Sequence, residues 1–248
     1  MNRALWIAVG AAGACAAAGL SVFLFNRIPA GWLCDYGEQP GEDLMGIRLH
    51  ACPHGAVMAL LLTAAFLGMG AQYEGRPFFL AAGCLLAVIL LLVSVSDFLY
   101  FIIPDQFVLA LLFAASVFSG YDLLSGQRLF HGGWLSPVLG GAAGAGLMLA
   151  VGLAGRFLFK KEAMGFGDVK LFAAAGAAAG FPGILFVFLL TIFSAFFSIV
   201  FLVLRRKDIK NLVLPFGPFI CLALLLFLIF HAQINSFADW YLSLLMIQ

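Results

Sequence analysis

The chain has 248 residues, of which 64% are hydrophobic and only 10% are charged, and its formal net charge is +1. Its mean hydropathy of +1.10 lies far from the balance of a soluble globular domain. The sequence contains no Gly-rich phosphate loop and no basic nucleic-acid-binding feature, so nucleic acid is not an expected partner. The composition indicates an integral membrane protein with the lipid bilayer as its surroundings.

Eight apolar runs are predicted to form transmembrane helices, because a spanning helix needs roughly 20 mainly apolar residues. In chain order they cover residues 4–25, 55–72, 78–96, 106–124, 135–155, 169–181, 184–204 and 213–231. The sixth run is short and rich in Ala and Gly, which is typical of a helix packed inside a bundle. We therefore expect an all-α integral membrane protein with about eight transmembrane helices, forming one polytopic domain over residues 1–248.

The amphiphilic tail beyond residue 232 is expected to reach the membrane surface, where Trp240 and Tyr241 would lie at the headgroup level. The orientation follows from Lys and Arg, which concentrate in cytoplasmic loops. With eight spans and an outside N-terminus, ten of these residues fall on the cytoplasmic side and three, Arg3, Arg76 and Arg128, fall outside. Both termini are then predicted to lie outside, and the loops 97–105 and 156–168 share the cytoplasmic face.

Two aspartates stand at the edges of apolar runs on this shared face. Asp97 ends the third run in SVSDFLYFIIPD, and Asp168 opens the sixth in MGFGDVK. A carboxylate at a membrane edge is unfavourable unless it is solvated, paired or functional. N-capping of a helix would explain Asp168, whereas Asp97 lies at a helix C-terminus, where the macrodipole disfavours an anion. Asp105 has a local explanation, because it follows Pro104 at the start of a helix.

Two carboxylates from different helices can share one proton, since like charges a few Å apart cannot both ionise cheaply. One then acts as general base on a water, and the protonated one polarises the scissile carbonyl. Asp97 and Asp168 are therefore predicted to form an aspartyl protease pair. Gly165 and Gly167 would allow a tight turn and the close approach of an extended substrate.

Four stretches of the chain resemble the type IV prepilin peptidases, a family of GxGD membrane aspartyl proteases. In the family's order they are GLSVFLFNRIP at 19–29, SVSDFLYFIIPD at 94–105, MGFGDVK at 164–170 and LPFGPFI at 214–220. The resemblance implies a bundle of eight helices and removal of the short basic leader from type IV prepilins or pseudopilins. In this family the cut falls after a Gly, at the cytoplasmic face of the bacterial inner membrane.

The resemblance also assigns roles to residues. Asp97 and Asp168 match the catalytic pair, and Gly165 and Gly167 match the motif glycines. Lys170 and Asp105, which belong to the same motifs, are expected to position the substrate or the backbone.

Many family members carry a zinc-binding insert with two Cys-x-x-Cys pairs and also N-methylate their product with S-adenosylmethionine. Here a short loop, 26–54, takes the place of that insert and contains no Cys-x-x-Cys. Its zinc-compatible side chains are Cys34, His50, Cys52 and His54. Because the spacing HACPH is too tight for an ordinary structural site, they are weak metal candidates and zinc is not expected. Proteolysis by the pair requires no cofactor, and methyl transfer stays open.

Two alternatives remain at this point. One is a different GxGD intramembrane protease that cuts within a substrate helix, although such enzymes usually have a Tyr-Asp pair where this chain has Ser96 and Asp97. The other is a small proton- or cation-coupled transporter whose two acids carry the ion. A transporter would be expected to show an internal repeat, and the sequence shows none. The sequence does not predict the oligomeric state.

Overall fold

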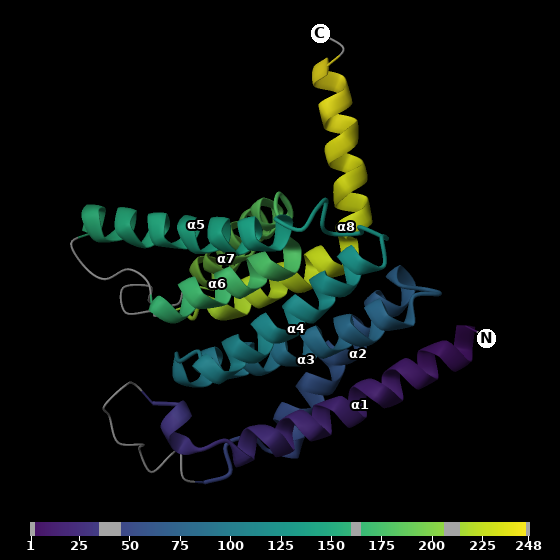
Figure 1. The fold of residues 1–248 in the computed structure, drawn as a ribbon. Coiled ribbons are helices and arrows are strands. Elements are labelled where there is room, and N and C mark those ends of the chain that lie inside the picture. Colours follow the sequence, from purple (N-terminus) through teal and green to yellow (C-terminus); the bar gives the residue numbers. More distant parts are fainter. Residues whose placement is uncertain (1–2, 35–45, 160–164, 206–213, 247–248) are drawn as a thin grey trace.

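The computed structural model describes residues 3–34, 46–159, 165–205 and 214–246 (Figure 1). Within these ranges the protein is helical and has no strands. The long helices are α1 (Arg3–Arg27), α2 (Ala56–Gln72), α3 (Pro77–Tyr100), α4 (Asp105–Leu124), α5 (Ser136–Phe159), α6 (Phe166–Ala179), α7 (Gly183–Leu204) and α8 (Gly217–Met246). Two short helical turns, Ala30–Trp32 and Ala51–Gly55, lie between α1 and α2. Each predicted run therefore corresponds to a helix, which confirms the all-α class.

Seven of the described helices are long and apolar enough to cross a membrane, and α6 is the exception. Its 14 residues rise about 21 Å at 1.5 Å per residue, which is less than the roughly 30 Å of a hydrocarbon core. The prediction that the sixth run forms a transmembrane helix is therefore corrected: α6 is too short to cross the bilayer by itself. The protein is a multi-pass membrane protein in which α6 is an inner, mostly buried helix.

Close backbone contact holds α6 against α5. A Cβ on Gly140 would overlap the carbonyl oxygen of Gly176, and a Cβ on Gly176 would overlap that of Gly140. A side chain at either position would therefore force the two helices apart. Small residues permit such an approach inside a membrane bundle, so the Ala/Gly-rich composition of the sixth run is explained by packing.

Consecutive long helices run in alternating directions, as Figure 1 shows for α3 to α6. The end of α3 and the start of α6 consequently lie at the same end of the bundle. Three cations lie there too: Arg27 at the end of α1, Arg156 in the last turn of α5 and Lys170 near the start of α6. Arg76 precedes α3 and Arg128 lies between α4 and α5, at the opposite end. Arg27, Arg156 and Lys170 thus lie at one end of the bundle and Arg76 and Arg128 at the other, as the sequence predicts.

Hydrogen bonds of Asn26 and Arg48 join the end of α1 to residues 48–49 in the connection between α1 and α2. The Asn26 carboxamide accepts hydrogen bonds from the backbone N–H groups of Arg48 (3.0 Å) and Leu49 (2.8 Å) and donates one to the Leu49 carbonyl (2.8 Å). The Arg48 guanidinium donates to the carbonyl oxygen of Ile28 at 2.7 Å. Asn26 of the stretch 19–29 therefore joins the end of α1 to residues 48–49.

A buried polar network stabilises the end of the bundle that lies opposite to α3's C-terminus. The Asp122 carboxylate accepts hydrogen bonds from the backbone N–H groups of residues 129–131 at 2.7 to 3.0 Å and from His131 Nδ1 at 2.9 Å. Ser119 Oγ lies 3.2 Å from His131 Nε2 and donates to the carbonyl oxygen of Ala177 in α6. The network joins α4, the α4–α5 connection and the C-terminal turn of α6.

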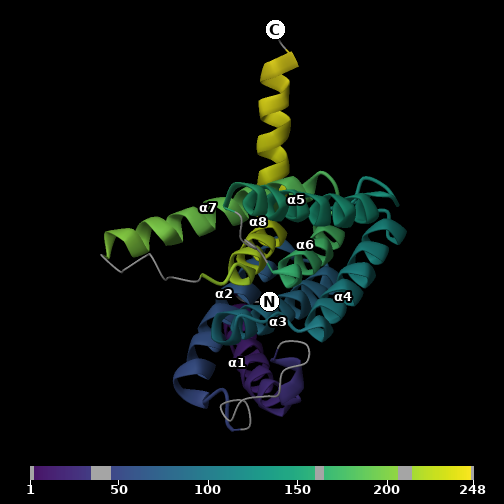
Figure 2. The same ribbon diagram turned by 90° about the vertical axis from the view of Figure 1, so that its left-hand side faces the viewer.

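The last part of α8 leaves the bundle, as both views show (Figure 2). Helical geometry is interrupted at Phe230, with φ of −110° and ψ of 16°. The tail predicted to be amphiphilic is therefore a helical extension beyond a kink. Trp240, one of its two predicted interface residues, is 56% exposed, whereas the side chain of Tyr241 lies outside the described residues.

Candidate active site

Asp97 lies in the last turn of α3, and its side chain is only 5% exposed. The helix ends at Tyr100. The next residue, Phe101, has a left-handed backbone with φ of 56°, and its N–H donates to the Asp97 carbonyl oxygen at 2.9 Å. Ser96 Oγ donates to the carbonyl oxygen of Ile102 at 2.8 Å and so holds the turn after the helix. The predicted position of Asp97 at a helix C-terminus is confirmed.

The start of α8 stabilises the Asp97 carboxylate, which the macrodipole at the C-terminus of α3 disfavours. The backbone N–H of Gly217 donates to Asp97 Oδ2 at 2.8 Å, and the positive end of α8 favours a negative charge there. A Cβ on Gly217 would lie 2.7 Å from the same oxygen, so only Gly fits. Gly217 is not among the site residues predicted from the sequence. The signal was present in the stretch LPFGPFI, where Pro218 follows Gly217 and fits a first helical turn because it needs no N–H partner.

Asp168 is the third residue of α6, and Gly165, rather than Asp168, is the N-cap. The Asp168 N–H donates to the Gly165 carbonyl oxygen at 3.2 Å. Because it is in the first turn of α6, Asp168 lies at the end of the bundle where α3 ends. Burial, and after it the negative charge of Asp97, raises the pKa of Asp168 to about 7, against the opposing effect of the Gly165 N–H.

One cavity of about 540 Å³ brings Asp97 and Asp168 together. Its walls come from the loop after α1, the connection between α3 and α4, and the first turn of α6. Three aromatic side chains, Trp32, Phe101 and Phe166, line it and are 38%, 52% and 66% exposed. Two carboxyl groups thus line one cavity, and that of Asp168 has a raised pKa. The cavity is at the end of the bundle and is large enough to admit part of a peptide.

Asp105 and Lys170 line the same cavity and are joined by an ion pair. Lys170 Nζ lies 2.7 Å from Asp105 Oδ1 and 2.9 Å from Oδ2. The Lys170 ammonium also lies 5.2 Å from the centre of the Phe166 ring. Asp105 is the first residue of α4, as predicted. Its ion pair with Lys170 is an additional interaction that local helix-start reasoning does not reveal, and it links the start of α4 to the N-terminal part of α6.

The two motif glycines have a different structural basis from the one expected. Neither Gly165 nor Gly167 is among the residues with positive φ, so neither is required there for an unusual backbone conformation. A Cβ on Gly167 would lie 3.2 Å from the Cβ of Ile103, in the connection between α3 and α4. Gly167 therefore allows α6 to approach that connection, which brings the two aspartates to one cavity.

The four weak metal candidates do not form a ligand set. Cys34 lines the cavity of Asp97, whereas His54 lines a separate pocket beside α2 and α3. The rings of His50 and His54 are stacked with their centres 6.2 Å apart. In the part of the chain that the structure describes, no three His, Cys, Asp or Glu side chains are grouped as a metal site would require. These residues do not fit the zinc site of the family's larger insert.

Comparison with known proteins agrees with this arrangement. The model of the type IV leader peptidase family matches residues 84–200, a range that includes Asp97, Asp105, Asp168 and Lys170. A relative from Escherichia coli (strain K12), a prepilin leader peptidase/N-methyltransferase, is 30% identical over 184 residues, which are 73% of this chain and 77% of the relative. The chain belongs to the type IV leader peptidase family.

Other members of the type IV leader peptidase family are similar over shorter shares of this chain. Leader peptidase HopD of Escherichia coli is 32% identical over 59% of this chain and 88% of its own length. A prepilin leader peptidase/N-methyltransferase of Aeromonas hydrophila is 32% identical over 65% of this chain, and the matched part is 52% of that relative. The chain thus spans about half the length of the Aeromonas protein. No solved structure matches it significantly.

Proposed function

We propose that this protein is a membrane aspartyl endopeptidase that removes the leader peptide from type IV prepilins or pseudopilins. The site would act at the cytoplasmic face of the bacterial inner membrane. The observation that carries the proposal is the common cavity of Asp97 and Asp168, which come from different helices and lie 71 positions apart in the family's two motif segments. Family membership and the basic residues at this end of the bundle support the same conclusion.

The pair supplies both a base and an acid at neutral pH. The ionised carboxylate takes a proton from a water, and the water oxygen attacks the scissile carbonyl while the protonated carboxyl donates to the carbonyl oxygen. The tetrahedral intermediate then collapses, the C–N bond breaks, and the proton passes to the leaving amine. Because the two acids titrate as a unit, the shared proton belongs to the pair rather than to one residue. The pKa of Asp168, raised by burial to about 7, supports retention of that proton near neutrality.

The surroundings of the pair support binding of an extended peptide. The Gly217 N–H holds Asp97 Oδ2 in one orientation and leaves the other oxygen for water. A helical substrate hides its carbonyl groups in internal hydrogen bonds, so it must unwind before water can attack. A Gly before the cut lowers the free energy of unwinding by up to about 1 kcal/mol relative to Ala. Trp32, Phe101 and Phe166 offer aromatic surface to the unwound chain.

The two alternatives have less support. A transporter is disfavoured because the chain belongs to a peptidase family. A protease that cuts inside a membrane helix is disfavoured because the cavity lies at the end of the bundle, beside the starts of α4 and α6. The names of the relatives include N-methyltransferase, and methyl transfer with S-adenosylmethionine stays a prediction for this chain.

The proposal is tested by co-expression with a prepilin from the same genome. Leader removal is measured by a gel shift, and mass spectrometry gives the new N-terminus and any added methyl group. We expect one cut after the Gly at the leader boundary. A prepilin that stays uncut beside folded, membrane-inserted protein would contradict the proposal, and a cut in the middle of the substrate's hydrophobic helix would favour the intramembrane protease.

A further inference from the structure

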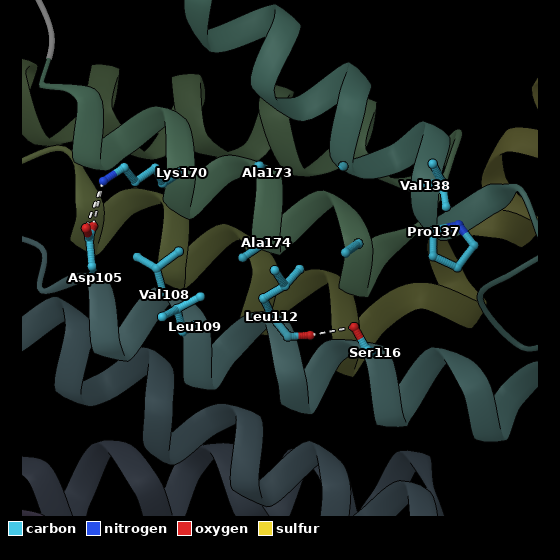
Figure 3. A pocket seen from close by; sticks show the side chains of 12 residues that line it. Asp105, Val108, Leu109, Leu112, Ser116, Pro137, Val138, Lys170, Ala173 and Ala174 are labelled. Carbon is cyan, nitrogen blue, oxygen red and sulfur yellow. Dashed lines mark hydrogen bonds and ion pairs between the residues drawn. The ribbon is translucent and has the colours of Figure 1, made fainter.

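A second cavity, of about 590 Å³, lies between α4, α5 and α6 (Figure 3). We call this cavity the α4–α6 groove. Figure 3 shows Leu109 and Leu112 on α4 beside it and Val138 of α5 at the end away from Lys170. Its lining is apolar apart from Ser116 and the Asp105–Lys170 pair. The groove is therefore a hydrophobic feature distinct in chemistry from the catalytic cavity.

The groove adjoins the catalytic cavity, because Asp105 and Lys170 line both. Their ion pair marks the boundary, with Nζ to carboxylate distances of 2.7 and 2.9 Å. Lys170 follows Asp168 by two positions near the start of α6. An occupant of the groove that extends past this pair consequently reaches the two aspartates.

The lining indicates what kind of chain the groove can hold. The Ser116 hydroxyl donates to the carbonyl oxygen of Leu112 at 2.8 Å, so its proton is already used. An extended backbone would find too few partners for its N–H and C=O groups, whereas a helix satisfies them internally. Gly141, Ala173 and Ala177 form a wall of small residues that a helix can approach closely. The stretch of α4 from Val108 to Ser116 is about 12 Å long at 1.5 Å per residue, enough for two helical turns.

We propose that the α4–α6 groove binds the apolar helix of the membrane-bound substrate, next to the scissile bond. The inference rests on the proposed peptidase function and names the second half of its substrate site. The helix lies along α4 and α5, and the segment that joins it to the leader unwinds beyond the Asp105–Lys170 pair, at the aspartates. A lipid headgroup is a poorer occupant of this end of the groove, because the Lys170 charge is already paired with Asp105 and leaves no net charge for a phosphate.

Neighbouring residues provide matched controls for a cross-linking experiment. Val138 and Leu112 line the groove and are 67% and 40% exposed, whereas the adjacent Leu139 and Phe113 do not line it and are 51% and 73% exposed. A benzophenone amino acid is placed at each position in the full protein, which is reconstituted with prepilin in lipid nanodiscs. We expect prepilin adducts from the two groove positions and not from their neighbours. Adducts with lipid alone, adducts with a second copy of the protein, or equal prepilin capture at all four positions would overturn the proposal.

Cleavage kinetics separate the groove from the peptidase function itself. Val138→Trp and Leu112→Trp fill the groove and are expected to raise KM for full prepilin at least tenfold. They should leave cleavage of a short peptide with leader and cut site, but no apolar segment, unchanged. Leu139→Trp and Phe113→Trp should change neither reaction. The groove assignment is overturned if the filling variants match wild type on both substrates or lose both alike, whereas failure of the wild type to cut either substrate contradicts the peptidase function.

Discussion

Asp97 receives its hydrogen bond from a residue 120 positions later in the chain. Sequence reasoning identifies Asp97 as an unfavourable anion at a helix C-terminus, but it cannot identify the partner, because that contact depends on where α8 begins in space. The motif glycines show the same limit. Their presence is evident from the sequence, whereas the contact of Gly167 with Ile103 follows only from the packing of α6 against the α3–α4 connection.

Gly217→Ala is expected to lower cleavage at least about tenfold, equivalent to about 1.4 kcal/mol. The new Cβ would lie 2.7 Å from Asp97 Oδ2 and 3.2 Å from its Cγ, so the carboxylate must turn away from the amide. The measurement is kcat/KM for prepilin cleavage by purified protein. Gly120→Ala is the control, because a Cβ there meets no atom within 4 Å. Equal activity of the two variants would show that the Gly217 contact does not orient Asp97.

The dependence of cleavage on pH should have an alkaline limb near pH 7. Burial, with a smaller contribution from the charge of Asp97, raises the pKa of Asp168 to about 7. Below that pH the pair holds its shared proton, and above it both carboxylates ionise, so no acid remains to polarise the carbonyl. We expect kcat/KM to fall about tenfold per pH unit on the alkaline side. A constant kcat/KM from about pH 6 to 9 would exclude an essential acid that titrates in this range in the free enzyme.

At the scale of elements, α6 is fixed at both ends. Its first two turns carry Asp168 and Lys170, and its last turn accepts the Ser119 hydrogen bond at Ala177. The short Ala/Gly-rich sixth run predicts an inner helix correctly. At 13 residues it is also the shortest of the eight runs, but it does not give the ends of α6, because these depend on the connections at Gly165 and Gly180.

Asp122→Asn is expected to lower the free energy of unfolding by about 3 kcal/mol, because it removes the charge from a fully buried, hydrogen-bonded pair with His131. The amide also places N–H donors opposite the backbone N–H groups of residues 129–131. Thermal unfolding in detergent measures the change. Glu74→Gln, at an exposed acid in the connection between α2 and α3, serves as the control. If both variants unfold at the wild-type temperature, the network does not stabilise the fold.

At the scale of the whole molecule, hydrophobic runs predict the number, order and direction of the helices, because each run must bury its backbone in lipid or protein. The same reasoning predicts that Asp97 and Asp168 share one end of the bundle, since the parity of the spans fixes it. The α4–α6 groove could not be predicted in this way. Its walls come from α4, α5 and α6, the approach of α5 to α6 depends on the Gly140–Gly176 contact, and a single sequence does not show which glycines meet.

The measurement that tests the catalytic pair most directly is prepilin cleavage by Asp97→Asn, Asp168→Asn and the double variant. Asn keeps an oxygen that can accept from Gly217, so insertion and thermal unfolding should match wild type. We predict that each single variant falls to the uncatalysed background and that the double variant falls no further, because the two acids act as one unit. Asp105→Asn should have a milder effect. A near wild-type rate in either the Asp97 or the Asp168 variant, in folded protein, would contradict the two-aspartate mechanism.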